Sequence, residues 1–514
     1  MLEHVAIDPP PAPAVTPDAK PRHIRVAIVG SGFSGLGMAI RLKQEGIEDF
    51  EVLERAGELG GTWRDNTYPG CACDIPSHLY SFSFAPNPDW SRTYSPQPEI
   101  WSYLRRCAER FGIIPHLRFG HEVLSATWDE DAARWHIETA AGPLTAQVLV
   151  VGPGPLSEPS TPEIPGLDSF EGTAFHSAEW DHGHDLTGER VAVIGTGASA
   201  IQFVPGIQPK VGRMTVFQRT PPWVMPNPDR PISERERRVY RARPLAQWLV
   251  RGAIYASREI LVLGIAKRQS LAKPIEALAR CHLRRQIADP ALRARLTPSY
   301  RIGCKRILVS NEYYPALEQP NVEVVTEAIR EVRPGSVVTE SGAEHHVDTI
   351  IHGTGFRPME LPLAEHLRGR GGVLLEDRWH GAPRAHLGTT VAGFPNFFLL
   401  IGPNTGLGHN SMVYMIECQL AYVMDCLRTM EERGLAAVDV RAEAQAEFNR
   451  EVQEQMKGTV WIEGGCASWY LDAEGVNRTL WPSFTFAFRR RTRRFDAESY
   501  RTQRRTRESE PAAA

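Results

Sequence analysis

The segment IRVAIVGSGFSG, residues 24–35, decides the fold of this 514-residue chain. Its first six residues are mostly apolar, as is typical of a buried strand, and its glycines have the spacing G-x-G-x-x-G. A helical pattern and a second apolar run, Phe50–Leu53, follow it. A glycine-rich turn that joins such a strand to a helix presents backbone amides to a pyrophosphate. The segment therefore predicts an α/β fold with a Rossmann-like dinucleotide-binding unit.

The residue that ends the second strand indicates which dinucleotide binds. Glu54 lies 24 residues after Gly30, at the position where an acid accepts hydrogen bonds from a free ribose. A nearby turn, residues 60–63 (GGTW), suggests a backbone that passes close to a flat ligand. We therefore expect FAD at this unit, in contact with Gly30, Gly32, Phe33, Ser34, Gly35, Glu54, Gly61, Thr62, Trp63, Asp74, Tyr80, Val123 and Met412.

A second unit of the same kind spans residues 190–219. An apolar strand leads into GTGASA (195–200), and the next strand ends at Arg219. Arg219 lies 24 residues after Gly195, the register that Glu54 has in the first unit, and an arginine there suits a 2′-phosphate. We therefore expect NADPH rather than NADH, held by Gly195, Thr196, Gly197, Ala198, Ser199, Ala200, Gln202 and Arg219.

The two units divide the chain into two domains. Residues 227–300 are rich in Arg, Leu and Ala at helical spacing, which predicts a helical insertion in the NADPH unit. The Pro/Ala-rich start lacks the apolar run of a secretory signal. We expect a disordered segment over 1–22, an FAD-binding domain over 23–155 and 375–500, an NADPH-binding domain over 156–374 with the insertion at about 227–300, and a C-terminal tail over 501–514.

The composition is that of a soluble globular protein, with 42% hydrophobic and 23% charged residues. A net charge of −3 gives no sign of a nucleic-acid or anionic-membrane partner. The longest apolar helical stretch, Leu245–Lys267, is interrupted by Arg251, Arg258 and Glu259. It predicts an amphipathic helix rather than an integral membrane segment, and peripheral membrane contact through it stays open.

None of the eight cysteines forms a C-x-x-C pair, which argues against a metal site, a dithiol redox motif and a disulfide framework. Cys71 and Cys73, the closest pair, have one residue between them. We therefore expect no metal and a reducing, cytoplasmic compartment.

One flavin and one NADPH on the same chain imply hydride transfer from nicotinamide to flavin. A disulfide reductase would need a redox dithiol beside the flavin, and the spacing of Cys71 and Cys73 does not supply one. An oxygenase must instead stabilise a negatively charged peroxide. That chemistry requires a fixed cation, such as an arginine, near the reactive ring and an acid that orients it.

Two longer motifs lie beside the glycine turns. The segment FEGTAFHSAEWD fits F-x-G-x-x-x-H-x-x-x-W-(P/D) at Phe170, Gly172, His176, Trp180 and Asp181. A second pattern, (A/G)-G-x-W-x-x-x-x-(Y/F)-P-G-x-x-x-D, is matched at Gly60, Gly61, Trp63, Tyr68, Pro69, Gly70 and Asp74. With the two glycine turns, these motifs resemble those of the type I Baeyer–Villiger monooxygenases, which are class B flavoprotein monooxygenases. The resemblance extends from about Val26 to Trp481.

The resemblance implies a catalytic pair. Arg306 corresponds to the arginine that stabilises the C4a-peroxyflavin, and Asp74 corresponds to the acid that positions it. Lys305, with Arg219 and Thr220, corresponds to the residues that hold the 2′-phosphate of NADPH.

Other family positions are implied to act outside the chemical step. Trp469 resembles a mobile-loop tryptophan that covers the nicotinamide, and His176 and Trp180 resemble residues that couple domain movement. The chain departs from the family's pattern at four positions. These are Ala72, where some relatives carry an arginine, Pro153 and His352 in the small motifs of the domain crossovers, and Ala200 at the third glycine of the second turn.

The implied activity uses FAD, NADPH and O₂ to insert one oxygen atom next to a ketone carbonyl, which gives an ester or a lactone. Two alternatives remain. One is N- or S-oxygenation of amines or sulfides, and the other is an NADPH oxidase or reductase that does not oxygenate. A fixed cation such as Arg306 favours a deprotonated, nucleophilic peroxide and therefore favours the ketone reaction over N- or S-oxygenation.

Overall fold

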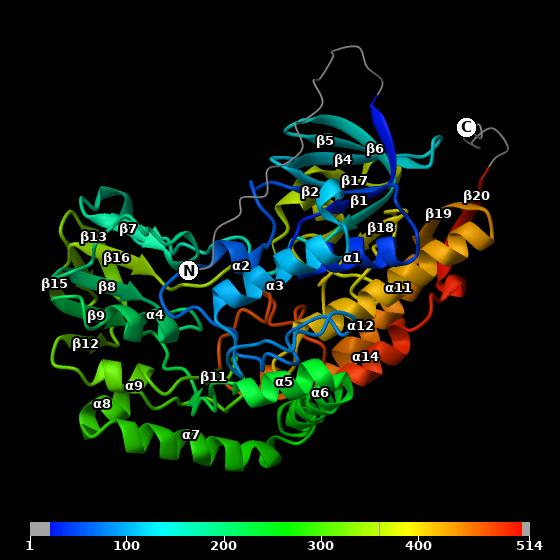
Figure 1. Cartoon of the computed structure of the whole chain (residues 1–514). Helices are drawn as coiled ribbons and strands as arrows, with labels where there is room; N and C mark the ends of the chain where they lie inside the picture. The colour runs from blue at the N-terminus through cyan, green and yellow to red at the C-terminus, as the bar shows by residue number, and fades with distance from the viewer. Residues whose placement is uncertain (1–20, 359, 506–514) are drawn as a thin grey trace.

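The computed structural model of the protein describes residues 21–358 and 360–505, which two Rossmann-like sheets organise (Figure 1). The larger sheet has the order β17-β4-β5-β6-β1-β2-β3, and β18 also pairs with β6. β1 runs parallel to β2 and β6, whereas β4, β5 and β6 form an antiparallel meander. The strands are β1 (Arg22–Val29), β2 (Phe50–Glu54), β3 (Leu117–Phe119), β4 (Val123–Asp129), β5 (Arg134–Thr139), β6 (Gly142–Val151), β17 (Leu367–Arg368) and β18 (Phe397–Leu399).

The second sheet is wholly parallel, with the order β12-β9-β8-β16-β7. The connection from β8 to β9 passes through helix α4 (Ala200–Ile207), because two adjacent parallel strands need a crossover between them. The predicted α/β class with two Rossmann-like units is confirmed. The strands are β7 (Thr173–His176), β8 (Arg190–Ile194), β9 (Arg213–Phe217), β12 (Val322–Val325) and β16 (Thr349–His352).

Helices cover the first sheet and form the largest core with it. α1 packs against α11, and Leu36, Ile40 and Val423 are fully buried in the same apolar cluster. Burying one such side chain stabilises the fold by about 1.5–3 kcal/mol. The helices of this unit are α1 (Phe33–Gln44), α2 (Thr62–Asp65), α3 (Gln97–Arg110), α11 (Met412–Glu432), α12 (Ala442–Met456) and α14 (Thr485–Thr492), and the second sheet carries α4 (Ala200–Ile207) and α9 (Tyr313–Leu317).

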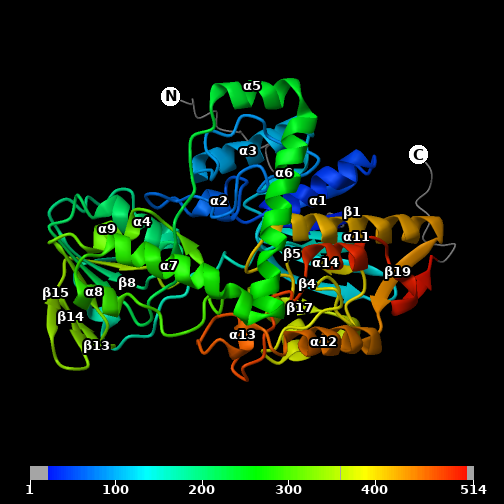
Figure 2. The same ribbon diagram turned by 90° about the horizontal axis from the view of Figure 1, so that it is seen from below.

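The predicted helical insertion lies between β10 (Val224–Met225) and β11 (Leu308–Val309). Figure 2 shows α5 and α6 beside the first unit and α7 and α8 beside the second. Within the described residues, no helix is long and apolar enough to cross a membrane. The insertion consists of α5 (Glu234–Ala242), α6 (Pro244–Glu259), a π-helical turn (Leu263–Lys267), α7 (Lys273–Gln286) and α8 (Pro290–Arg295).

The structure differs from the expected organisation in several short elements. β17 already pairs with β4, so the chain returns to the first sheet before residue 375. β20 (Tyr500–Arg504) pairs with β19 (Leu435–Val440), so a strand occupies the start of the expected tail. Runs this short carry too little alternation to identify a strand. Helix α3, the hairpin β4–β5 and the sheet of β13 (Ile329–Arg333), β14 (Ser336–Thr339) and β15 (Glu344–His346) were also not predicted. Residues 1–20 of the expected disordered segment and 506–514 of the expected tail lie outside the described residues.

Candidate active site

The first glycine turn is fixed to the strands on either side of it. Gly30 has a φ of +91°, and a Cβ there would lie 2.7 Å from the Gly152 carbonyl oxygen. A Cβ at Gly35 would lie 1.8 Å from the Gly30 carbonyl oxygen, so helix and turn touch. The backbone N–H and the hydroxyl of Ser31 donate to Glu54, at 3.0 and 2.6 Å. Glu54 is therefore a buried, satisfied acid at the carboxyl end of β2.

The same turn leaves room and donors for a pyrophosphate. Helix α1 begins after Gly32, and no side chain caps its first amides. Gly61 packs against Gly32, since a Cβ at Gly61 would lie 3.2 Å from the Gly32 Cα. Uncapped amides at a helix start favour an anion. The cradle fits the phosphates of a dinucleotide such as FAD.

The remaining residues expected to contact FAD surround this cradle. The indole N–H of Trp63 donates to the Tyr80 hydroxyl at 3.1 Å, and the Phe33 and Tyr80 rings lie 5.2 Å apart. Val123 opens β4, just after the His121 N–H donates to the Glu54 carbonyl. Buried Ser34 lies in the first turn of α1, Thr62 opens α2 and Met412 opens α11.

The second glycine turn repeats the backbone of the first. Gly195 has a φ of +109°, and a Cβ there would lie 2.3 Å from the Gly353 carbonyl oxygen. A Cβ at Gly197 would meet nothing closer than 3.9 Å, so this glycine faces open space. The Thr196 hydroxyl donates to the Thr220 carbonyl at 3.2 Å, which ties the turn to the end of β9. α4 also begins without a side-chain cap, and Ala198 and Ser199 lead into its first residue, Ala200.

Two cations lie close together at the end of β9. Arg219 is exposed, and Lys305 is half-buried. Burial, and then the charge of Arg219, lower the pKa of the Lys305 ammonium. Neither side chain forms an ion pair with a residue in the described part of the chain. Two adjacent cations without an acidic partner fit an anion such as a 2′-phosphate.

Arg306 and Asp74 form a bidentate ion pair between the two units. The Nε and one Nη of Arg306 each donate to a carboxylate oxygen of Asp74 at 2.6 Å. The other Nη donates to the Leu407 carbonyl at 3.2 Å. Burial opposes the charge on Asp74, but the charge and hydrogen bonds of Arg306 hold the pKa of this carboxyl below its usual range. Burial likewise opposes the Arg306 cation, and Asp74 outweighs it and raises the pKa of the guanidinium. The pair therefore stays ionised, with about a quarter of each side chain exposed.

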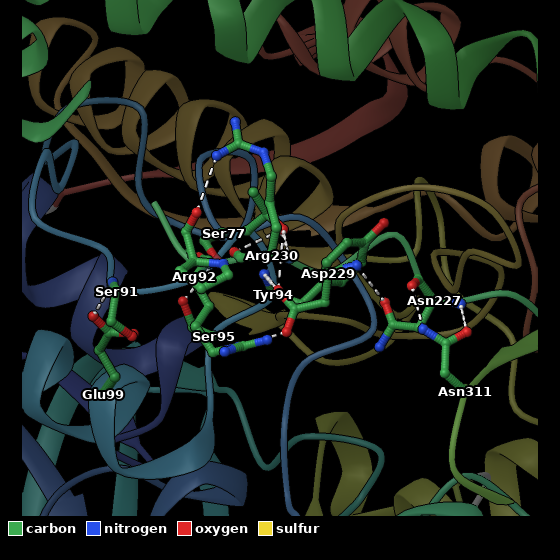
Figure 3. Close-up of polar contacts among 12 residues, drawn as sticks. Ser77, Ser91, Arg92, Tyr94, Ser95, Glu99, Asn227, Asp229, Arg230 and Asn311 are labelled. Carbon is green, nitrogen blue, oxygen red and sulfur yellow. Dashed lines mark hydrogen bonds and ion pairs between the residues drawn. The ribbon is translucent and has the colours of Figure 1, made fainter. Parts of the chain in front are cut away.

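The segment that carries Asp74 is bonded to the start of the helical insertion. The Cys73 N–H donates to the Ser95 carbonyl at 3.0 Å. Close by, the Asp229 carboxylate accepts from the Arg92 guanidinium at 2.6 Å and from the Tyr94 N–H at 3.0 Å (Figure 3). Residues 91–95 and 227–231 thus form one polar network, which holds the insertion against the first unit.

The segment that carries Arg306 is held from the other side by a disulfide. Cys304 is bonded to Cys466, and their Cα atoms lie 6.2 Å apart. This corrects the expectation that the cysteines stay reduced. The two cysteines are 162 residues apart in the sequence, so no short motif could predict that they pair. The other six cysteines are free.

The Tyr68-Pro69-Gly70 motif packs against α4 of the second unit. A Cβ at Gly70 would lie 2.7 Å from the Gln202 carbonyl oxygen. The Tyr68 hydroxyl donates to the Gln202 side-chain oxygen at 3.0 Å, and the Gln202 amide donates to the Ala72 carbonyl at 3.0 Å. The Gln202 side chain, expected at NADPH, is thus engaged with the segment that leads to Asp74.

The segment FEGTAFHSAEWD joins this interface through aromatic rings. Trp180 lies 5.4 Å from Phe203 of α4, and Phe203 lies 6.2 Å from Tyr68. A Cβ at Gly172 would lie 2.2 Å from a backbone carbonyl and 2.6 Å from the Phe170 ring, so only glycine fits.

The two polar residues of that segment's motif, His176 and Asp181, lie at turns. His176 ends β7, is buried, and accepts a hydrogen bond from a backbone N–H through Nδ1. Burial lowers the pKa of His176. Asp181 is exposed and accepts a hydrogen bond from the Gly183 N–H.

The predicted Trp469 lies next to Tyr470, which was not predicted as part of the site. Trp469 is 48% exposed, and its ring lies 4.4 Å from that of buried Tyr470. Burial raises the pKa of Tyr470 to about 12, and this hydroxyl is close enough to be influenced by Arg306 and Asp74. The Leu407 carbonyl was also missed, because a backbone acceptor carries no side-chain signal.

Known proteins resemble the chain over nearly its full length. Residues 27–237 match the family model described as pyridine nucleotide-disulphide oxidoreductase. A Baeyer–Villiger monooxygenase of Streptomyces coelicolor is 56% identical over 94% of this chain and 93% of its own. Cyclohexanone monooxygenase from Rhodococcus sp. Phi1, solved with NADP⁺, has a TM-score of 0.84 at 29% identity, over 95% of this chain and 100% of that one. A steroid monooxygenase solved with NADP has a TM-score of 0.83 at 30% identity, over 94% and 100%. The chain belongs to the Baeyer–Villiger monooxygenases.

Proposed function

We propose that this chain is an FAD- and NADPH-dependent monooxygenase whose reactive centre is the Arg306–Asp74 pair. FAD takes the first unit and NADPH the second. The substrates are O₂ and a ketone, and the product is an ester or a lactone. The observation that carries the proposal is the two-bond ion pair, which comes from segments 232 residues apart and lies between two dinucleotide cradles.

The two cradles support the cofactor assignment. Uncapped amides at α1 and α4 face the positions of two pyrophosphates. Glu54 offers a carboxylate where a ribose hydroxyl would lie, and Arg219 with Lys305 offers two cations where a 2′-phosphate would lie. When bound, FAD supplies the redox chemistry, since it takes a hydride from NADPH and delivers electrons to O₂.

Arg306 supplies the electrostatics of the oxygenation. Its guanidinium keeps a positive charge fixed in a partly buried place, where it stabilises a negatively charged oxygen nucleophile. Asp74 fixes the orientation of the guanidinium through two bonds, and the Leu407 carbonyl fixes a third N–H. A fixed cation disfavours the protonated, electrophilic oxidant, so N- or S-oxygenation is the lesser alternative.

The range of ketones remains wide in this proposal. The similar structures include one enzyme named for a small cyclic ketone and one named for steroids. We also propose an FAD domain and an NADPH domain with boundaries near those expected, and no nucleic-acid partner. The cytoplasm remains the proposed compartment because six cysteines are free, and the Cys304–Cys466 disulfide is the observation against it.

The test is a pair of arginine variants that each disturb a two-bond arginine–aspartate fork. Arg306→Lys should keep flavin and keep NADPH oxidation, but ester formation should fall about 10²–10³-fold. Oxygen uptake should then appear as H₂O₂. Arg190→Lys is the control, because Arg190 forms the same fork with Asp348 away from the site. Its ester yield per NADPH should stay at the wild-type value. Near-wild-type ester formation by Arg306→Lys would overturn the assignment.

A further inference from the structure

Helix α6 buries two polar residues and exposes most of its apolar ones, although Ile254 and Tyr255 pack partly against the core. Of its sixteen residues only the polar Gln247 and Glu259 are buried, whereas Ser257 is the one polar residue among those that are exposed. A surface helix ordinarily buries its apolar stripe and exposes its polar face. The exposed apolar residues follow helical spacing into the π-helical turn, and we call them the outer stripe: Leu245, Trp248, Leu249, Gly252, Ala253, Ala256, Ile260 and Leu263.

The inner face fixes the orientation of the helix. Glu259 accepts hydrogen bonds from the Asn410 side chain at 2.6 Å, and from the hydroxyl and backbone N–H of Thr485 at 2.7 and 3.0 Å. Arg251 donates to the His78 carbonyl at 2.7 Å. Turning α6 to bury its apolar side would leave these polar groups unpaired, and each such loss costs about 1–3 kcal/mol. The outer stripe is therefore held outward by the fold itself.

Basic side chains flank the outer stripe at both ends. Segment 233–273 holds ten basic and three acidic residues, in a chain whose net charge is −3. Six of the basic side chains are exposed and form no ion pair within residues 21–358 and 360–505. They are Arg235, Arg238 and Arg243 before the stripe and Lys267, Arg268 and Lys273 after it.

A hollow lies among the arginines at the junction of α5 and α6. Arg235, Arg238 and Arg243 line it together with Val239 and Ala242. Guanidinium groups bind phosphate oxygens through paired N–H donors. A surface hollow with three unpaired arginines, next to an apolar stripe, matches a lipid headgroup beside its acyl chains.

We propose that the outer stripe of α6 docks on a bilayer that contains anionic phospholipid. Leu249 and Ile260 enter the acyl boundary, Trp248 lies at the headgroup level, and the hollow takes phosphate groups. The basic ends meet the negative surface. α6 is shorter than the roughly 20 residues that cross a bilayer, so it lies in the membrane plane.

The charges disfavour a second copy of this chain on the same face. Two copies could pair α6 helices in parallel or antiparallel. Because both ends of the outer stripe are basic, either arrangement sets unpaired cations against cations. An anionic bilayer meets both ends with the opposite charge.

The test is co-sedimentation of the full-length, flavin-loaded protein with vesicles. Binding to phosphatidylglycerol–phosphatidylcholine vesicles should exceed binding to phosphatidylcholine vesicles and should fall as salt rises. The double variant Trp248→Gln/Leu249→Gln should bind at least about tenfold more weakly. The triple variant of Arg235, Arg238 and Arg243 to Gln should lose about tenfold or more on anionic vesicles only.

A matched control removes exposed apolar residues elsewhere. Leu124 and Val373 are 49% and 46% exposed, and Leu124→Gln/Val373→Gln should bind like the wild type. All variants should turn over a water-soluble ketone at the wild-type rate, which keeps this test separate from that of Arg306. The proposal is overturned by absence of binding to either vesicle, by equal loss in the control, or by a dimer in light scattering that the Trp248/Leu249 variant dissociates.

Discussion

The first dinucleotide unit keeps its strand-end acid inside the fold, whereas the second leaves its strand-end arginine in the open. Ser31 donates twice to Glu54, and at the same place in the second turn Thr196 donates to the Thr220 carbonyl. Arg219 therefore has no partner within its own turn. The two backbones build the same cradle, and we propose that the residue at the end of the second strand selects a free ribose in the first unit and a 2′-phosphate in the second.

The first glycine of each turn makes the same kind of close contact. The first glycine of the turn lies against a glycine carbonyl from the strand beside it, Gly30 against Gly152 and Gly195 against Gly353. A side chain at either position would strike that carbonyl. Substitution of either glycine should therefore distort the backbone to a similar extent, but the first substitution should impair FAD binding and the second NADPH binding.

Substituting these glycines should have the largest effect. Gly30→Ala should purify without flavin, because a Cβ 2.7 Å from a carbonyl and a φ of +91° together cost about 3 kcal/mol or more. Gly195→Ala should keep flavin, and flavin reduction by NADPH should fail. The measurements are the flavin-to-protein absorbance ratio and stopped-flow flavin reduction. Loss of flavin from both variants would break the assignment of one cofactor to each unit.

Removing the open arginine should have the next largest effect. Arg219→Ala should lower the preference for NADPH over NADH about 10–100-fold, since one charge-assisted contact contributes about 1.5–3 kcal/mol. Steady-state kcat/KM for both coenzymes measures it. Arg213→Ala is the control, because Arg213 begins the same strand and pairs with Glu323. An unchanged coenzyme ratio in Arg219→Ala would sink the phosphate assignment.

The two units should respond differently to acid because of the residue that precedes Gly152 in the first unit and Gly353 in the second. The first unit has Val151 there and the second has His352. Burial, then the charge of His176, lowers the pKa of His352 to about 4. The unfolded chain takes up a proton near pH 6.5 and the folded one near pH 4, so stability falls as the pH drops between these values.

The variant His352→Val should lose less unfolding free energy as the pH falls. At pH 5 the wild type should lose about 2 kcal/mol of unfolding free energy through His352 relative to pH 8. Urea unfolding at the two pH values measures the difference, which should shrink by about that amount in the variant. The exposed His366→Val serves as the control. An unchanged acid limb would show that His352 is protonated in the fold.

The titration of Lys305 should have the smallest effect, a change of about fivefold in NADPH binding. Burial and Arg219 lower the pKa of the Lys305 ammonium, so its charge is present at low pH and is lost as pH rises through the lowered pKa. Binding of NADPH should weaken over that range. In Arg219→Ala the alkaline limb should move to higher pH, because a repelling charge is gone. The pH profile of kcat/KM for NADPH tests this. If the alkaline limb of Arg219→Ala stays at the wild-type pH, the charge of Arg219 does not influence Lys305.

Most of the fold could be predicted from local sequence patterns. Both glycine turns, Glu54 and Arg219 lie within short stretches whose spacing follows from the geometry of a strand, a turn and a helix. The pairing of Asp74 with Arg306 spans 232 residues and came only from a family resemblance. The Leu407 carbonyl and the Cys304–Cys466 bond had no local signal at all.

Some motif residues were recognised without their physical role. Gly70 was named only as a position of a family pattern, and the structure shows that it is needed because α4 of the other unit lies against it. The interface between units is set by packing across the chain, and only the folded structure shows which surfaces meet.

The Cys304–Cys466 bond has a mechanical consequence. Arg306 lies two residues after one sulfur and Trp469 three residues after the other. A covalent tether this short removes independent travel of the two segments. A displacement of the Trp469 loop by more than a few residue lengths must move the Arg306 loop with it, so the two loops cannot travel far independently.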